Sequence, residues 1–216
     1  MTIRRISGPS LLLLVLLAGC RTGGSGSGPA IVQPGAPGEA SKVIGADRAT
    51  DVSKVSFTPA DVRFMQGMIG HHAQALEMTE IIRARSGNEA IRALALRIEV
   101  SQADEIKMMQ GWLAVRRQPQ PDPHAHHAPG ATLMPGMLTR EQLARLSEAS
   151  GPELDRLFLE LMIKHHEGAL VMVKDLLATP GAGQEADVFA FASDVEADQQ
   201  MEIDRMRAAL GASKES

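Results

Sequence analysis

The chain has 216 residues, of which 44% are hydrophobic, 22% are charged and only 3% are aromatic. Asp and Glu number 26 against 22 Lys and Arg, which gives a formal net charge of −4. This balance argues against nucleic acid as a partner, because nucleic-acid binding depends on clustered Lys and Arg. The only cysteine is Cys20, which excludes an internal disulfide, a Cys-x-x-Cys metal site and a thiol nucleophile in the domain that follows.

Residues 1–19 have the pattern of a secretion signal. Arg4 and Arg5 precede an apolar run at 11–17 that is too short to span a bilayer. The run leads into Leu-Ala-Gly-Cys, ending at Cys20, which resembles the lipobox of bacterial lipoproteins and implies cleavage before Cys20 and a lipid on its sulfur. We therefore expect an exported protein, lipid-anchored to the cell membrane or outer membrane and facing the periplasm or the outside. The alternative is a plain secreted protein with a free thiol.

The segment that follows, residues 20–56, is rich in Gly, Ser, Pro and Ala and has few large apolar side chains. Such a segment buries too little surface to offset the entropy lost on ordering, so we expect a flexible tether. No later segment is long and apolar enough to cross a membrane. The lipid is therefore the only membrane contact that the sequence predicts.

A first helical hairpin is predicted directly after the tether. Thr58 is a suitable N-cap with Pro59 at the first helical position, and Gly87 provides a stop after Ser86. Asn88 can cap a second helix at roughly 89–116. Both helices carry an apolar stripe at helical spacing.

A Pro-rich connection separates this hairpin from a second one, and no stretch shows convincing strand alternation. The sequence predicts an all-α, ferritin-like four-helix bundle over 57–211. Its parts are repeat one at 57–116, a linker at 117–138, a short helix at 139–149 and repeat two at 152–210. The linker is long enough to cross the whole bundle, as in ferritin-like connectivity, although a simple up-down arrangement remains possible.

The two hairpins are copies of one unit. Residues 61–78 align with 155–172 at a shift of 94 positions, so His71-His72 matches His165-His166. A second match, at a shift of 97, aligns residues 98–109 with 195–206. The chain therefore contains two copies of one helix-pair unit.

The repeated histidines fall on faces that should be buried. His72 lies near the centre of the apolar face of the first helix, with His71 on its shoulder. Counting outward from the turn at Gly87 puts His72 level with Gln102 in an antiparallel pair. The same count puts His166 level with Gln199. We therefore expect a polar layer inside the bundle in which His72, His166, Gln102 and Gln199 meet, with His71, His165, Glu105 and Glu202 on either side of them.

Two explanations compete for such a layer, because buried polar groups are costly unless they are paired. One is a His–Gln–Glu hydrogen-bond network that fixes register. The other is a metal site, since imidazole is a common metal ligand. Thioethers on adjoining helical turns favour copper, because thioethers suit Cu(I) and imidazole suits Cu(II). The candidate ligands are Met68, His71, His72, Met78, Met162, His165, His166 and Met172.

The linker contains a second group of possible ligands. His124, His126 and His127 lie close to Met134 and Met137. Such a His- and Met-rich tract can bind transition metals weakly and collect ions for the bundle. The alternative is an ordinary solvated linker.

The repeated motif also resembles a known family. Asp-x-x-Phe-x-x-x-Met-Ile-x-His-His-x-x-Ala-x-x-Met occurs twice, each time followed by Gln-x-x-Glu-Ile-x-x-Met. Over about residues 57–210 this resembles the bacterial DUF305 family, whose members are exported, often Met- and His-rich, and ferritin-like in fold. Some, of the cyanobacterial CopM type, are periplasmic copper-binding proteins. The resemblance implies copper binding by the matched Met and His residues. One departure, Leu159 in place of Met65, makes that outer Met position unsuitable as an obligatory ligand.

These observations predict a copper-binding envelope protein that sequesters or buffers the ion or hands it over to an envelope metal-handling partner, rather than an enzyme. A ferritin-like metal oxidase using Glu105 and Glu202 is the first alternative. A metal-free structural or adaptor bundle is the second. The sequence leaves the oxidation state of copper, Cu(I) or Cu(II), and the oligomeric state open.

Overall fold

The computed structural model describes residues 31–33, 40–45, 56–128 and 130–212, in two compact units that divide after Lys54. In the first unit, β1 (Ile31–Gln33) pairs antiparallel with β2 (Lys42–Ile44), with Val32 opposite Val43. The sequence analysis did not predict this strand pair in the proposed tether. The predicted signal peptide at 1–19, the lipidated Cys20 and much of the tether lie outside the described residues.

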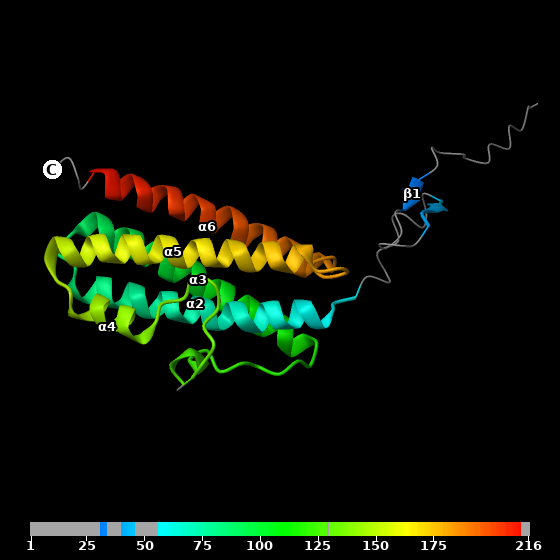
Figure 1. The fold of residues 1–216 in the computed structure, drawn as a ribbon, viewed down its shortest axis with the longest axis horizontal. Helices are drawn as coiled ribbons and strands as arrows, with labels where there is room; N and C mark the ends of the chain where they lie inside the picture. The colour runs from blue at the N-terminus through cyan, green and yellow to red at the C-terminus, as the bar shows by residue number, and fades with distance from the viewer. Residues whose placement is uncertain (1–30, 34–39, 46–55, 129, 213–216) are drawn as a thin grey trace, which may run out of the picture. The chain divides into compact units, whose positions relative to one another are not determined.

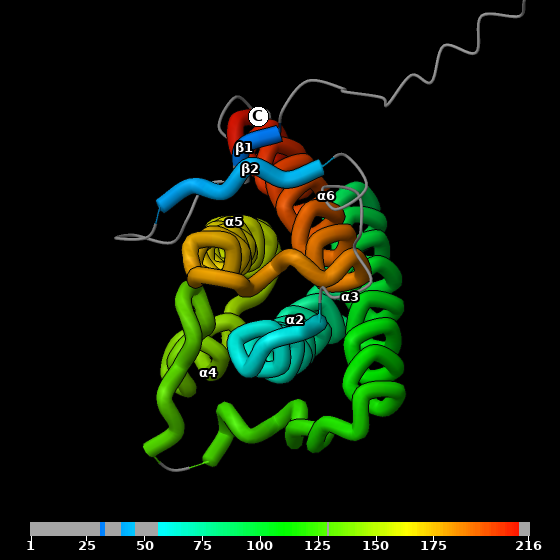
Figure 2. Tube along the Cα trace, turned by 90° about the vertical axis from the view of Figure 1, so that its right-hand side faces the viewer, coloured from blue at the N-terminus to red at the C-terminus, as the bar shows by residue number. Residues whose placement is uncertain are grey.

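The second unit is helical, as the sequence predicts. Its elements are α2 (Pro59–Arg85), α3 (Glu89–Val115), the 3₁₀ turn η1 (Ala125–His127), α4 (Arg140–Glu148), α5 (Gly151–Ala178) and α6 (Ala186–Ala212). The four long helices form a helical bundle with α2 packed against both α3 and α5 (Figure 2). Within the described residues, no helix is both long and apolar enough to cross a membrane.

Local side-chain contacts explain where α2 begins and ends. The Asp61 amide donates to Thr58 Oγ1 at 3.2 Å, while Asp61 Oδ2 accepts from the Thr58 amide at 2.6 Å, which makes a capping box. Asn88 Oδ1 accepts from the first free amides of α3. The expected glycine stop differs in detail, because Ser86 leaves the helix in an extended conformation and Gly87 has no positive φ.

Contacts at the two ends of the bundle establish the direction of each helix. Asp61 at the start of α2 accepts from the Gly183 amide beyond the end of α5, at 2.7 Å. At the other end, the Ser86 hydroxyl donates to Asp155 Oδ1 near the start of α5, at 2.6 Å. Hence α2 and α5 are antiparallel, and the connection from α3 to α5 crosses the length of the bundle (Figure 1). This is the ferritin-like connectivity, and the simple up-down alternative is excluded.

The hydrophobic core is split into two clusters by a polar layer. One cluster includes Ile82, Leu94 and Phe158, and the other includes Phe64, Trp112 and Phe191. Each long helix contributes residues to one cluster on one side of the polar layer and to the other cluster on the opposite side. The residues of the layer are polar and buried, namely His71, His72, Gln102, His165, His166, Gln199 and Glu202.

Candidate metal centre

The central layer brings the repeated histidines together inside the bundle. His71 on α2 and His165 on α5 have ring centroids 3.8 Å apart, with ring planes inclined at 40°. The neighbouring rings of each pair, His71 with His72 and His165 with His166, are 6.3 Å apart. All four side chains are fully buried. The structure thus buries all four histidines as the helical projections expect, but the two rings in contact are His71 and His165, which the projections placed at the edge of the layer.

Oxygen acceptors hold three of the four imidazoles. His72 Nε2 lies 2.5 Å from Glu105 Oε2, and His166 Nε2 lies 2.7 Å from Glu202 Oε2. His71 Nε2 lies 3.0 Å from the Pro135 carbonyl oxygen. A carbonyl or carboxylate oxygen accepts, so Nε2 donates in each case, and Nδ1 carries the lone pair of the neutral ring.

The remaining polar atoms of the layer are buried without hydrogen-bond partners. Among the described residues these are Nδ1 of His71, His72 and His166, both ring nitrogens of His165, both amide atoms of Gln102 and the Gln199 Oε1. An unsatisfied buried polar group costs about 1–3 kcal/mol. A metal-bound histidine typically donates its other N–H to a carboxylate or a backbone carbonyl. A free Nδ1 atom opposite an Nε2 atom that is held by an oxygen acceptor is the arrangement of a metal-binding histidine.

Burial also keeps the central pair in the form that binds metals. It lowers the pKa of His71 to about 3, with a further lowering from His72. The pKa of His165 is likewise held well below its usual range, chiefly by burial and then by neighbouring histidines. Both rings are therefore neutral at physiological pH, and a neutral imidazole is the metal-binding form.

The predicted methionines are divided between the interior and the surface. Met68, Met78 and Met162 are fully buried in the two core clusters that adjoin the layer. Met172 is only half-buried and lines a pocket of about 280 Å³ together with Met134 of the linker. A Cβ on Gly67 would lie 3.1 Å from Met134 Sδ and 3.5 Å from the Met172 methyl group. The two copies of the unit therefore differ at Met78 and Met172.

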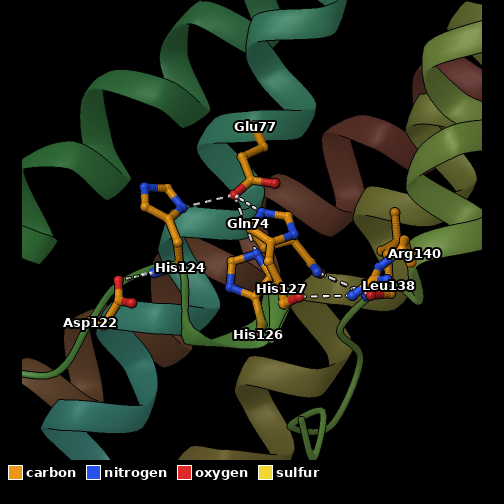
Figure 3. Close-up of polar contacts among 8 residues, drawn as sticks. All are labelled: Gln74, Glu77, Asp122, His124, His126, His127, Leu138 and Arg140. Atoms are coloured by element: carbon orange, nitrogen blue, oxygen red, sulfur yellow. Dashed lines mark hydrogen bonds and ion pairs between the residues drawn. The ribbon is translucent and has the colours of Figure 1, made fainter. Parts of the chain in front are cut away.

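The linker histidines form a separate cluster with a residue that the sequence analysis did not select. Glu77 of α2 is contacted by His124, His126 and His127 (Figure 3). In the part of the chain that the structure describes, this is the one group of three or more His, Cys or carboxylate ligand atoms within 4.8 Å of one another. Among the described residues, the central layer has no group of three His, Cys or carboxylate ligand atoms this close together. A metal ion bound there would therefore need methionine sulfur as a further ligand.

Comparisons with known proteins agree with this architecture. A family model described as "Domain of unknown function (DUF305)" matches residues 61–210. No curated protein matches the sequence. The crystal structure of a DUF305 fragment from Deinococcus radiodurans is 34% identical, with a TM-score of 0.64, and the match covers 72% of this chain and 98% of that one. A DUF305 protein from Streptomyces coelicolor, described as a candidate secreted protein, is 29% identical, with a TM-score of 0.61 and coverage of 71% and 93%.

Copper-bound structures are also among the similar folds. CopM in the Cu(I)-bound form is 26% identical to this chain, with a TM-score of 0.56 and coverage of 70% and 96%. CopM in the Cu(II)-bound form, at 24% identity and a TM-score of 0.59, supports the fold alone. The family model spans most of the helical unit and both histidine pairs. The chain belongs to the DUF305 family.

Proposed function

We propose that this protein binds copper in the central layer of its bundle. One observation carries the proposal: three buried imidazoles have Nε2 held by an oxygen acceptor while their Nδ1 atoms have no partner. A simple hydrogen-bond network would satisfy both nitrogens of each ring. A bound cation would instead use the lone pairs of Nδ1. His71 and His165 are the nearest pair and would provide the first two ligands.

The chemistry of the neighbouring side chains favours copper over iron. Met68, Met78 and Met162 provide buried thioethers in the core clusters on either side of the layer, and soft sulfur ligands suit Cu(I). Glu105 and Glu202 already accept hydrogen bonds from His72 and His166. They would orient those rings rather than form the carboxylate ligand set of a di-iron bundle. The Cu(I)-bound CopM structure supports the same choice of metal.

A bundle of this kind would store or deliver copper rather than turn over a substrate. We propose that it sequesters or buffers the ion, or hands it over to a metal-handling partner in the cell envelope. The signal sequence and Cys20 would place it outside the cytoplasm on a lipid anchor. The Streptomyces relative, described as a candidate secreted protein, supports export.

The test is copper binding by the purified full chain and a matched set of variants. We expect His71→Gln with His165→Gln to remove the tightly bound copper while circular dichroism shows unchanged helix content. His124→Asn with His126→Asn and His127→Asn is the control and should retain that copper. Unchanged copper uptake in the first variant would overturn the proposal. Equal thermal stability with and without copper would favour a metal-free structural bundle.

A further inference from the structure

The linker histidines converge on a single carboxylate oxygen outside the bundle core. His124 Nδ1, His126 Nε2 and His127 Nε2 lie 3.1, 3.2 and 2.9 Å from Glu77 Oε1. His124 and His127 have hydrogen-bond geometry toward this oxygen. His126 does not, and both of its ring nitrogens are buried without a hydrogen-bond partner although its side chain is only 5% exposed. A nearly buried imidazole that lies 3.2 Å from a carboxylate oxygen without hydrogen-bond geometry can bind a cation together with that carboxylate.

The backbone of the linker holds these side chains in position. The amides of His124 and Ala125 donate to the side chain and carbonyl of Asp122, and the His127 amide donates to the His124 carbonyl. Residues three apart in a 3₁₀ turn point to the same side, so η1 directs His124 and His127 toward α2. Arg140 donates to the His127 carbonyl at 2.7 Å (Figure 3). The cluster is therefore a built arrangement rather than a set of independent surface histidines.

The spacing of the ligand atoms fits a small cation. At metal–nitrogen distances near 2.0–2.1 Å, neighbouring ligands of a tetrahedral ion lie about 3.3 Å apart. The three nitrogens are already 2.9–3.2 Å from the Glu77 oxygen, and all four ligand atoms are within 4.8 Å of one another. Small side-chain rotations would bring them around one ion.

The ligand types differ from those of the central layer. Three imidazole nitrogens and one carboxylate oxygen, with no sulfur, suit borderline divalent cations such as Zn²⁺ and Cu²⁺. We propose that Glu77, His124, His126 and His127 form a second metal site for a divalent cation of this class, and that the bound ion fastens the linker to α2. This site does not depend on copper in the bundle.

Fastening the linker has a structural consequence further along the chain. Pro135 supplies the carbonyl that accepts from His71 Nε2, and Gln74, one turn before Glu77, pairs with the backbone of Leu138 at 3.0 and 2.7 Å. An ion bound by Glu77 and the three histidines would add a cross-link between α2 and the linker, ahead of the contacts that Pro135 and Leu138 make with α2. We therefore expect occupancy of the site to protect the linker from cleavage.

Zn²⁺ binding to the full chain tests the site. Titration calorimetry and zinc analysis after gel filtration should show one Zn²⁺ that is weakened at least tenfold by Glu77→Gln or His126→Asn. Glu80→Gln, an exposed carboxylate on the same helix, is the matched charge control and should bind Zn²⁺ normally. His71→Gln with His165→Gln should also bind it normally, which separates this site from the copper layer.

A second measurement reports on the ligands themselves. Zinc X-ray absorption should show only nitrogen and oxygen neighbours, and added Zn²⁺ should slow cleavage of the linker by a protease in the wild type but not in Glu77→Gln. Zinc binding that persists in the Glu77 and His126 variants, or sulfur in the ligand shell, would overturn the proposal. Loss of zinc only in the bundle variant would do the same.

Discussion

The rings of His71 on α2 and His165 on α5 are in contact at the centre of the bundle, with centroids 3.8 Å apart. They occupy the same position in the two copies of the unit, so the pseudo-symmetry of the bundle makes each the neighbour of the other. Neither ring is exposed. Of their four ring nitrogens, only His71 Nε2 has a hydrogen-bond partner. This relationship makes the stability of the protein depend on pH.

Acid should destabilise the metal-free protein through His71. Its pKa is lowered from 6.5 to about 3 by burial, so the unfolded chain takes up a proton below pH 6.5 that the folded chain does not. Stability is therefore complete above pH 6.5 and falls as the pH decreases toward 3. The loss at pH 5 should be about 2 kcal/mol from this residue. Urea unfolding of the metal-free wild type and of His71→Gln at pH 5 and pH 7.5 measures this loss of unfolding free energy. An equal pH dependence in the two proteins would show that His71 is not its source.

Removing the acceptor of His166 should weaken both folding and copper binding. Glu202→Leu leaves His166 Nε2 buried without its 2.7 Å partner, which should cost about 1–3 kcal/mol of unfolding free energy. The loss of the residue that orients the ring should also reduce copper affinity by about 10- to 100-fold. Glu202→Gln retains an acceptor oxygen and should have a smaller effect on both. Competition with a copper chelator provides the affinity, and equal affinities for the two variants would rule out the orienting role.

The close approach of the linker to α5 should depend on Gly168. A Cβ at this position would overlap the Pro135 carbonyl and the Gly136 Cα, so Gly168→Ala must displace the segment that holds His71 Nε2. We expect a loss of about 3 kcal/mol in unfolding free energy. Gly111→Ala is the matched control, because a Cβ there meets nothing within 4 Å, and it should stabilise α3 by about 0.5–1 kcal/mol. Equal effects in chemical denaturation would show that the linker does not dock as described.

Asp61 should contribute more to stability than an ordinary helix cap. It is fully buried and accepts from the Thr58 amide, the Thr58 hydroxyl and the Gly183 amide, at 2.6, 2.9 and 2.7 Å. Asp61→Ala should therefore cost roughly 3 kcal/mol, against about 1 kcal/mol for Thr58→Ala, which removes only part of the cap. Thermal unfolding of the two variants compares them directly. A smaller loss for the Asp61 variant would mean that the contact with Gly183 adds nothing.

The sequence by itself determined the helices, the repeat and the identity of the polar residues in the central layer. These features follow from local rules, because caps such as Thr58 and Asn88 act within one turn and burial follows the 3.6-residue period. Counting from the turns placed Gln102 and Gln199 level with His72 and His166, whereas the contact between His71 and His165 was not predicted. The predicted layer therefore needed no information from the linker.

Only the tertiary structure decided how the linker completes this arrangement. The length of the linker allowed it to cross the bundle, but its sequence has no periodicity. Nothing in it indicated that the Pro135 carbonyl would accept from His71 or that three histidines would contact Glu77. Glu77 lies on the polar face of α2 and is 47 positions from His124, a separation over which local patterns carry no information. The different burial of Met78 and Met172 was likewise not predicted from the repeat: Met78 is fully buried, whereas Met172 lines a pocket together with Met134 of the linker.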